Sequence, residues 1–234
     1  MRLDKLMASQ GLGSRADCKK WIRKKQVTVN GAVVTDPGIA VDPEADTVVV
    51  SGQTVRYQEH LYLMLNKPLG VVSATEDRDA VTVVDLVPPE LSRDGLFPAG
   101  RLDADTTGFI LLTDDGEFAH RILSPKNHIF KTYVATLKAP VRDSDLQELR
   151  EGIRLSDGTR CLPAEVSVLD PHTVQIRICE GKYHQIRRMF AAAGNRVLAL
   201  TRTAMGTLPL DPSLAPGACR ELTEEERARI TERP

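Results

Sequence analysis

Short strand-like segments separated by turn residues fill the second half of the chain and restrict the folds open to it. Segment 129–137 alternates from face to face, as a β-strand does, and places Tyr133 and Leu137 on the same side. Strand-like runs lie at 61–65, 71–73, 109–112, 129–137, 153–155, 164–169, 174–179 and 197–200. Helical patterns lie between them, at 115–123, 141–149 and 183–193. Because strands outnumber helices, the sequence predicts an α+β fold with a mostly antiparallel mixed sheet.

The first 60 residues predict a separate small module. Two helical patterns end by residue 24, and Ser14 is placed to cap the second one, with Asp17 three positions later. Segment 27–34 then has the pattern of a β-hairpin around the turn dipeptide Asn30-Gly31. Because residues 56–60 have the polar composition of a linker, we expect two domains, 1–58 and 59–234.

Basic residues are concentrated in two parts of a chain whose formal net charge is only −1. Residues 1–30 carry eight Lys or Arg against two acidic residues, whereas residues 31–60 carry one against five. A third zone, 181–210, has five basic residues and no acidic one. Segregated positive charge is typical of nucleic-acid binding, because each phosphate that is neutralised releases counterions. The alternative is an ordinary solvated helix face.

The densest chemistry lies in the nine residues 100–108, GRLDADTTG. In an extended segment, Arg101, Asp103 and Asp105 would share one face. One alternative is a set of surface ion pairs, worth roughly 0 to 1 kcal/mol each. Another is a calcium loop of the EF-hand type, since oxygen-bearing residues recur at the right spacing. The context argues against calcium, because Pro98 precedes the segment and turn residues follow it, where an EF-hand requires helices.

GRLDADTTG resembles the signature of the pseudouridine synthases, in the RsuA branch that carries an N-terminal S4 domain. The resemblance continues through MLNKPLGVVS, TDDGEFAHRILSP, KTYVATL and GKYHQIRRMFAAAGNRV, at 64–73, 113–125, 131–137 and 181–197. The pattern RLDKLMASQGLGSR…VTVNG is similar to the S4 RNA-binding fold. The resemblance therefore implies a small S4-like (αL) module at 1–58 and a pseudouridine synthase catalytic domain at 59–234.

The resemblance also implies roles for residues at matching positions. Asp103 would be the nucleophile, Tyr133 would line the uridine pocket, and Arg187 would pair with the nucleophilic aspartate. A nearby cation would keep a buried carboxylate ionised, lowering its pKa by about 1 to 3 units. Arg101 would take the place of the target nucleotide when that nucleotide leaves its stack. We assign Asp105 a structural role.

RNA contacts are expected from polar side chains in both domains. In the S4-like module the candidates are Arg2, Lys5, Ser14, Arg15, Lys19, Arg23 and Lys24. In the catalytic domain they are Arg101, Lys67, Lys182, His184 and Arg188. Lys67 has two equal interpretations, a phosphate contact or a solvated loop lysine. For the basic face of the 183–193 helix, the alternative is again simple solvation.

The resemblance predicts isomerisation of a specific uridine to pseudouridine in small-subunit (16S) ribosomal RNA, on a flipped-out nucleotide. One alternative is the same reaction on large-subunit (23S) ribosomal RNA. A second is a non-catalytic, RNA-binding ribosome-assembly factor. A third is hydrolysis of a glycosidic bond by Asp103 and Asp105, although two residues so close on one strand are poorly placed to flank a bond.

No cofactor and no metal are expected, because the isomerisation involves no net redox change and the sequence has neither a P-loop nor a dinucleotide-binding glycine motif. The four cysteines show no metal-ligand spacing. No apolar run approaches the ~18 residues of a membrane span, and no apolar signal core opens the chain. We therefore expect a cytoplasmic, monomeric protein whose partner is ribosomal RNA, within an assembling small subunit, with no membrane partner.

Overall fold

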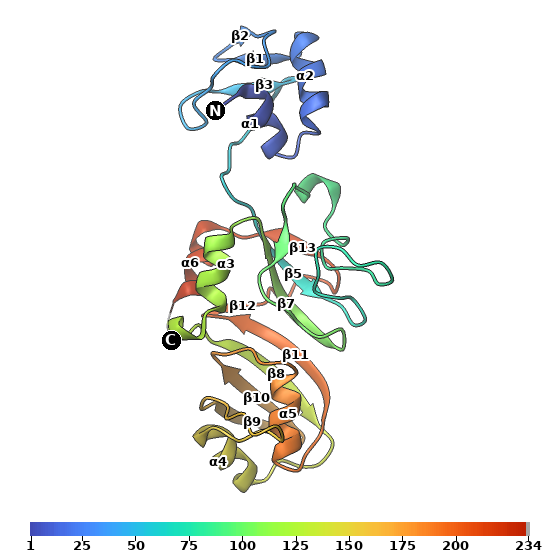
Figure 1. Cartoon of the computed structure of the whole chain (residues 1–234), viewed down its shortest axis with the longest axis vertical. Helices are drawn as coiled ribbons and strands as arrows, with labels where there is room; N and C mark the ends of the chain where they lie inside the picture. Colours follow the sequence, from blue (N-terminus) through green and yellow to red (C-terminus); the bar gives the residue numbers. More distant parts are fainter. Residues whose placement is uncertain (233–234) are drawn as a thin grey trace. The chain divides into compact units, whose positions relative to one another are not determined.

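The computed structural model describes residues 1–232, so the last two positions of the predicted 59–234 domain lie outside the described residues. The chain forms two compact units (Figure 1). The first contains Met1–Leu61 and Pro88–Leu96, and the second contains Tyr62–Val87 and the chain from Phe97 onward. Within residues 1–232, no helix is long and apolar enough to span a lipid bilayer.

The first unit packs two helices on a small sheet, as the sequence predicts. The helices are α1 (Leu3–Ser9) and α2 (Arg15–Arg23), and the strands are β1 (Val27–Val29), β2 (Ala32–Val33), β3 (Val48–Val50) and β4 (Gln53–Thr54). The sheet has the order β2-β1-β3-β4. Ser14 caps α2 by accepting from the backbone N–H of Asp17, and Asn30 and Gly31 form the hairpin turn with positive φ angles. Leu3, Leu6 and Ile22 are fully or almost fully buried in the core of this unit.

The second unit is built on a nine-stranded sheet of the order β13-β5-β7-β11-β8-β10-β9, with β6 paired to β7 and β12 to β11. Its strands are β5 (Tyr62–Lys67), β6 (Phe97–Pro98), β7 (Thr106–Thr113), β8 (Lys131–Leu137), β9 (Glu165–Asp170), β10 (Thr173–Ile178), β11 (Val197–Met205), β12 (Leu208–Pro209) and β13 (Cys219–Glu221). Its α-helices are α3 (Gly116–Leu123), α4 (Asp143–Glu151), α5 (Gln185–Ala192) and α6 (Glu224–Thr231). Short 3₁₀ turns occupy Pro89–Leu91, in the first unit, and Pro125–Asn127. The mostly antiparallel α+β fold is confirmed.

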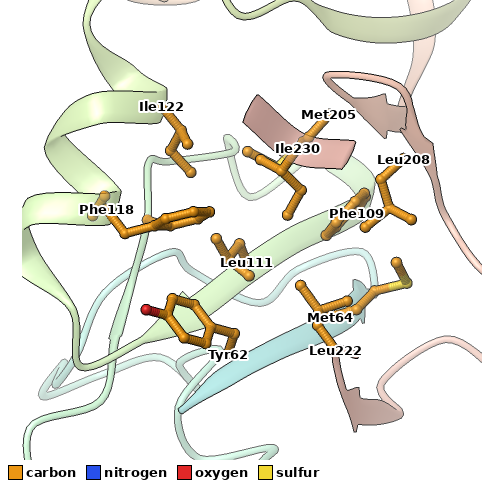
Figure 2. Close-up of a cluster of buried hydrophobic side chains, with 12 residues drawn as sticks. Tyr62, Met64, Phe109, Leu111, Phe118, Ile122, Met205, Leu208, Leu222 and Ile230 are labelled. Atoms are coloured by element: carbon orange, nitrogen blue, oxygen red, sulfur yellow. The ribbon is translucent and has the colours of Figure 1, made fainter. Parts of the chain in front are cut away.

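One hydrophobic cluster joins β5 and β7 to α3, α6 and β12. Figure 2 shows Tyr62 and Phe118 facing one another, with ring centroids 5.1 Å apart in an edge-on arrangement. Phe109 and Leu111 alternate with buried neighbours on the other face, so β7 is apolar along most of its length. A strand that is buried on both faces has a nearly continuous run of apolar residues. The run at 109–112 has this pattern and therefore predicts the strand.

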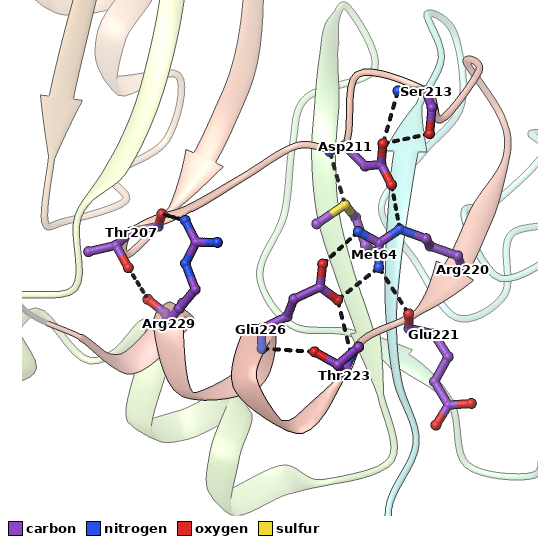
Figure 3. A network of polar contacts seen from close by, with 9 residues as sticks. All are labelled: Met64, Thr207, Asp211, Ser213, Arg220, Glu221, Thr223, Glu226 and Arg229. Atoms are coloured by element: carbon purple, nitrogen blue, oxygen red, sulfur yellow. Dashed lines mark hydrogen bonds and ion pairs between the residues drawn. The ribbon is translucent and has the colours of Figure 1, made fainter.

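A polar network fixes the C-terminal part of the second unit (Figure 3). Arg220 on β13 forms an ion pair with Asp211 at 2.7 Å and another with Glu226 on α6 at 2.7 Å. Thr223 caps α6, and its hydroxyl accepts from the backbone N–H of Glu226. Arg229 donates to the Thr207 carbonyl at 2.8 Å. These contacts tie α6 to the β11–β12 turn and to β13, and they tie β13 to the segment after β12. The last described elements are thus held by the fold of the second unit.

The strands β7 and β11 form the parallel joint of this sheet, the only parallel strand pair among residues 1–232. Their register pairs Gly108 with Arg202. Gly108 has a φ of +97°, and an added Cβ would lie 2.3 Å from the Arg202 carbonyl oxygen. Only glycine allows this close approach of two backbones. The joint brings the segment that precedes β7 beside the segments carried by β8 and α5.

Several predicted elements differ in extent from the observed ones, and three of them are shorter than predicted. The predicted strands 153–155 and 71–73 are reduced to isolated bridges, Arg154 with Arg160 and Val72 with Thr82. The helix predicted from residue 183 begins at Gln185, because His184 adopts a left-handed conformation with a φ of 46°. Edge strands β12 and β13 are too short to give a sequence pattern.

Candidate active site

Four residues that the resemblance assigns to the reaction line one cavity of about 580 Å³ in the second unit. They are Arg101, Asp103, Tyr133 and Arg187. They come from three segments that are far apart in the sequence: the loop before β7, strand β8 and helix α5. The volume lies within the usual range for pockets that hold small organic groups, roughly 300 to 1,000 Å³.

Asp103 lies in a loop whose backbone is held by hydrogen bonds at Leu102 and at Asp103 itself. The buried hydroxyl of Ser73 donates to the Leu102 carbonyl at 2.8 Å and accepts from the Leu102 N–H at 3.0 Å. The Asp103 carbonyl accepts from the Thr106 N–H at 3.0 Å. The Asp103 carboxylate remains about one third exposed, and its Oδ1 lies 3.4 Å from Nε2 of His184. The backbone is thus held while the carboxylate points toward the cavity.

The predicted ion pair between Arg187 and Asp103 is wrong for this structure. Arg187 Nη2 lies 3.0 Å from Oδ2 of Asp105 and 3.0 Å from the Asp105 carbonyl oxygen. The reason is local: residues 104 and 105 form a turn, so the two carboxylates do not share one face as they would in an extended strand. The cationic partner nearest to Asp103 is His184, when its ring is protonated.

Asp105 and Arg187 also line a second hollow, of about 690 Å³, together with Lys138 and Arg196. Asp103 lines the first cavity and Asp105 the second, so Arg187 lies between the two. The Arg187 side chain is mostly buried, at 19% exposed, and its Nε has no hydrogen-bond partner. The arrangement separates the two carboxylates that the hydrolase alternative would use together.

Lys67 requires a second correction, because it is neither a phosphate contact nor a solvated loop lysine. It ends strand β5 and is completely buried. Its ammonium group donates to the carbonyls of Ala104 at 3.3 Å and Thr106 at 2.9 Å, and to that of Pro68 at 3.1 Å. Burial lowers the pKa of Lys67 to about 8, although the charges of Asp105 and Asp103 oppose that shift. Lys67 thus stabilises the turn that follows Asp103 by donating hydrogen bonds to its backbone carbonyls.

Tyr133 and Arg202 face one another across β8 and β11, where they are direct register partners. Tyr133 is 8% exposed and lines the cavity. Arg202 is 3% exposed, donates to the Phe109 carbonyl at 2.6 Å and reaches the Tyr133 hydroxyl at 3.5 Å. Its Nη2 has no hydrogen-bond partner. Sequence reasoning missed Arg202 because its only signal was membership of a basic zone.

The remaining predicted contacts on this side have protein partners. Lys182, which lines the cavity, forms an ion pair with the buried Glu180. Arg188 pairs with Asp157 at 2.5 Å and does not line the cavity. Arg101 is exposed at the cavity wall. Among residues 1–232, no three His, Cys, Asp or Glu side chains come together in a way that could hold a metal ion.

In the first unit, three of the predicted RNA-binding cations surround one buried carboxylate. Asp4 is completely buried and lies 3.2 Å from Arg2, 3.1 Å from Arg15 and 3.8 Å from Lys19. Burial would raise the pKa of Asp4, but hydrogen bonds from the two arginines outweigh it and lower that pKa. The other predicted residues, Lys5, Ser14, Arg23 and Lys24, are exposed. Asp4 therefore holds half-exposed cations together on one surface.

Both units of the chain are similar to known protein families. Residues 61–192 match the RNA pseudouridylate synthase family, and residues 1–47 match the S4 domain. The chain is 47% identical over 236 residues to an uncharacterized RNA pseudouridine synthase of Bacillus subtilis strain 168, with 99% of both chains covered. It is 43% identical over 231 residues to ribosomal small subunit pseudouridine synthase A of Escherichia coli K12, with 98% of this chain and 100% of the relative covered.

A solved structure supports the same assignment. The crystal structure of a pseudouridylate synthase aligns with a TM-score of 0.69 at 40% sequence identity, and the alignment covers 98% of this chain and 99% of the other. Sequence and fold thus match over nearly the full length of the chain. The chain therefore belongs to the RNA pseudouridine synthases, as an enzyme of the RsuA type with an N-terminal S4 domain.

Proposed function

We propose that this enzyme isomerises one uridine of small-subunit (16S) ribosomal RNA, with Asp103 as nucleophile on a flipped-out nucleotide. The observation that carries the proposal is the shared cavity, in which Asp103, Tyr133 and Arg187 from three distant segments meet. A uridine paired in RNA cannot enter a cavity of this kind, so the nucleotide must leave its stack. Arg101, exposed at the cavity wall, can then occupy the vacated place.

The reaction breaks the bond from C1′ to N1, turns the uracil and joins C1′ to C5, while one proton leaves C5 and one is gained at N1. Asp103 supplies the ionised carboxylate that attacks the nucleotide. Tyr133 lies against the detached base and takes part in removing the C5 proton. Arg187 supplies positive charge to the cavity wall, and its ion pair with Asp105 leaves the Asp103 carboxylate open to the substrate.

Ribosomal RNA is supported as the substrate by the relatives and by the S4 domain. Two full-length relatives at 43% identity, from Yersinia pestis and Escherichia coli, are named as ribosomal small subunit pseudouridine synthase A. In our proposal, residues 1–58 bind RNA and residues 59–234 carry out the reaction. The protein acts as a monomer in the cytoplasm, on RNA within an assembling small subunit.

The proposed RNA contacts are polar side chains that are exposed or half-buried. In the first unit they are Arg2, Lys5, Arg15, Lys19, Arg23 and Lys24, with Ser14 beside them at the start of α2. In the second unit they are Arg101, Lys182, His184 and Arg188. Lys67 is not among them, because its ammonium group is completely buried.

The decisive experiment incubates the enzyme with small-subunit RNA, free and in partly assembled particles, and maps carbodiimide-dependent stops of reverse transcription. We expect one new stop with the wild type and none with Asp103→Asn. Asp143→Asn, which alters an exposed carboxylate on α4, is the matched control and should give the same stop as the wild type.

Each alternative gives a different result. A stop that persists with Asp103→Asn would refute the role of Asp103. If the wild type gives no stop while it and Asp103→Asn bind equally well, the protein is an assembly factor. A stop only in large-subunit RNA would change the substrate, and release of free uracil would indicate hydrolysis.

A further inference from the structure

An exposed pair of stacked aromatic rings lies at the wall of the active-site cavity. Tyr183 is 74% exposed, and its ring stacks on that of His184 with centroids 3.9 Å apart and an interplanar angle of 17°. Both residues line the cavity. Scattered exposed apolar side chains are normal on proteins. Tyr183 differs because the His184 ring stacks on one of its faces and because Tyr183 lines the cavity.

The loop that carries the rings is held in place by buried polar contacts. Glu180, which is 6% exposed, binds Lys182 and Gln185 through its carboxylate and accepts from the Leu162 N–H at 2.9 Å. The Gln185 side chain also accepts from the Lys182 N–H at 2.8 Å. The rings therefore stand on a fixed support, and the exposure of Tyr183 is not that of a loose loop.

His184 connects this platform to the reacting carboxylate. Its Nε2 lies 3.4 Å from Asp103 Oδ1, and its backbone has the left-handed φ of 46°. A residue other than glycine held in this region is uncommon, and such residues cluster at functional sites. The conformation places the His184 ring between Asp103 and Tyr183, so that the aromatic pair leads from the reaction centre to the solvent.

We infer that the exposed face of Tyr183 stacks on the base of a nucleotide adjacent to the extruded uridine, an inference that rests on the proposed function. When one nucleotide leaves a stack, its neighbour loses a stacking partner. An aromatic side chain can replace that partner for any base, because every base has a π-face. The ligand is thus an unpaired RNA base. Two cationic side chains, Arg101 and Lys182, line the same cavity as Tyr183.

The test measures RNA affinity in the Asp103→Asn background, so that no reaction takes place. Two probes are used: small-subunit ribosomal RNA and a fully base-paired RNA duplex. Tyr183→Ala and Tyr183→Leu remove the aromatic face, whereas Tyr183→Phe keeps it. Leu169→Ala removes another exposed apolar side chain, 56% exposed, that does not line the cavity and serves as control. Thermal melting confirms that each variant is folded.

We expect Tyr183→Ala and Tyr183→Leu to weaken binding to small-subunit RNA about 5- to 150-fold, the usual range for loss of one base–aromatic stack. Tyr183→Phe and Leu169→Ala should bind as the parent does, and duplex binding should not change. The inference is overturned if Tyr183→Ala binds small-subunit RNA like the parent, or if it weakens binding to both probes equally. Because pseudouridine formation is scored separately with the wild type, failure of the proposed function would leave this binding result interpretable.

Discussion

Replacing Gly108 with alanine is expected to loosen the parallel joint between β7 and β11. The new Cβ would lie 2.3 Å from the Arg202 carbonyl oxygen and 3.0 Å from its nitrogen, at a φ of +97°. Backbone strain at such a φ costs about 1–3 kcal/mol, and overpacking adds about 1–3 kcal/mol. The sum, about 2–6 kcal/mol, is a large part of a typical unfolding free energy of about 5–15 kcal/mol.

Gly158→Ala is the matched control, because Gly158 has a similar φ of +84° with nothing within 4 Å of an added Cβ. It should pay only the backbone strain. Urea unfolding is measured for both variants and analysed with equal m-values. The difference between their unfolding free energies, expected to be about 1–3 kcal/mol, is the cost of the close approach. Gly108→Ala should also lower pseudouridine formation at a temperature where it is still folded, because the joint positions Asp103. Equal destabilisation of the two variants would refute this reasoning.

Three further changes test separate contacts. Burial, and then the hydrogen bond to Asp115, raise the pKa of Tyr62 to about 12. The stability that the folded state gains from a protonated Tyr62 is therefore fully present below pH ~10 and should fall by about 3 kcal/mol as the pH rises through 12. Urea unfolding at each pH should show no such fall in Tyr62→Phe, and parallel curves for the two proteins would contradict this reasoning. Lys67→Met removes the buried donor to the turn that follows Asp103 and should lower the single-turnover rate about 10²-fold. An unchanged rate would show that the reaction does not depend on this donor. Arg202→Met leaves a buried β7 carbonyl and the Tyr133 hydroxyl without their donor, so urea unfolding should show a loss of about 1.5–3 kcal/mol, and a loss below ~0.5 kcal/mol would count against these bonds.

Elements with a strong local pattern could be predicted from the sequence. The alternation that predicts a strand at 129–137 gives β8, and the apolar stripe of the predicted 183–193 helix gives the buried Ile186 and Met189 of α5. The turn at Asn30-Gly31 also follows from local chemistry. In each case a spacing of two or of three to four residues decides which face is buried, so neighbours in sequence suffice.

The contacts that organise the site could not be predicted from local sequence patterns. One bend after Asp103 sends Asp105 to the other side of Arg187, and no spacing rule indicates where such a bend falls. Lysines are rarely fully buried, so Lys67 gave no reason to expect three carbonyl partners. Arg202 meets Tyr133 only through the pairing of β11 with β8, and the two residues are 69 positions apart in the sequence.

The β7–β11 joint also sets the order in which the enzyme can become active during synthesis. Gly108 can pair with Arg202 only after residue 202, which lies 94 residues later in the chain (202 − 108), has been synthesised. The two halves of the sheet cannot meet before that. At a translation rate of about 5–20 residues per second, this delay is about 5–20 s. A nascent chain that ends before Val197 already contains Asp103 and Tyr133 but lacks the strand that brings their halves of the sheet together. We therefore expect such a chain to be inactive and catalysis to begin only when nearly the whole protein has been made.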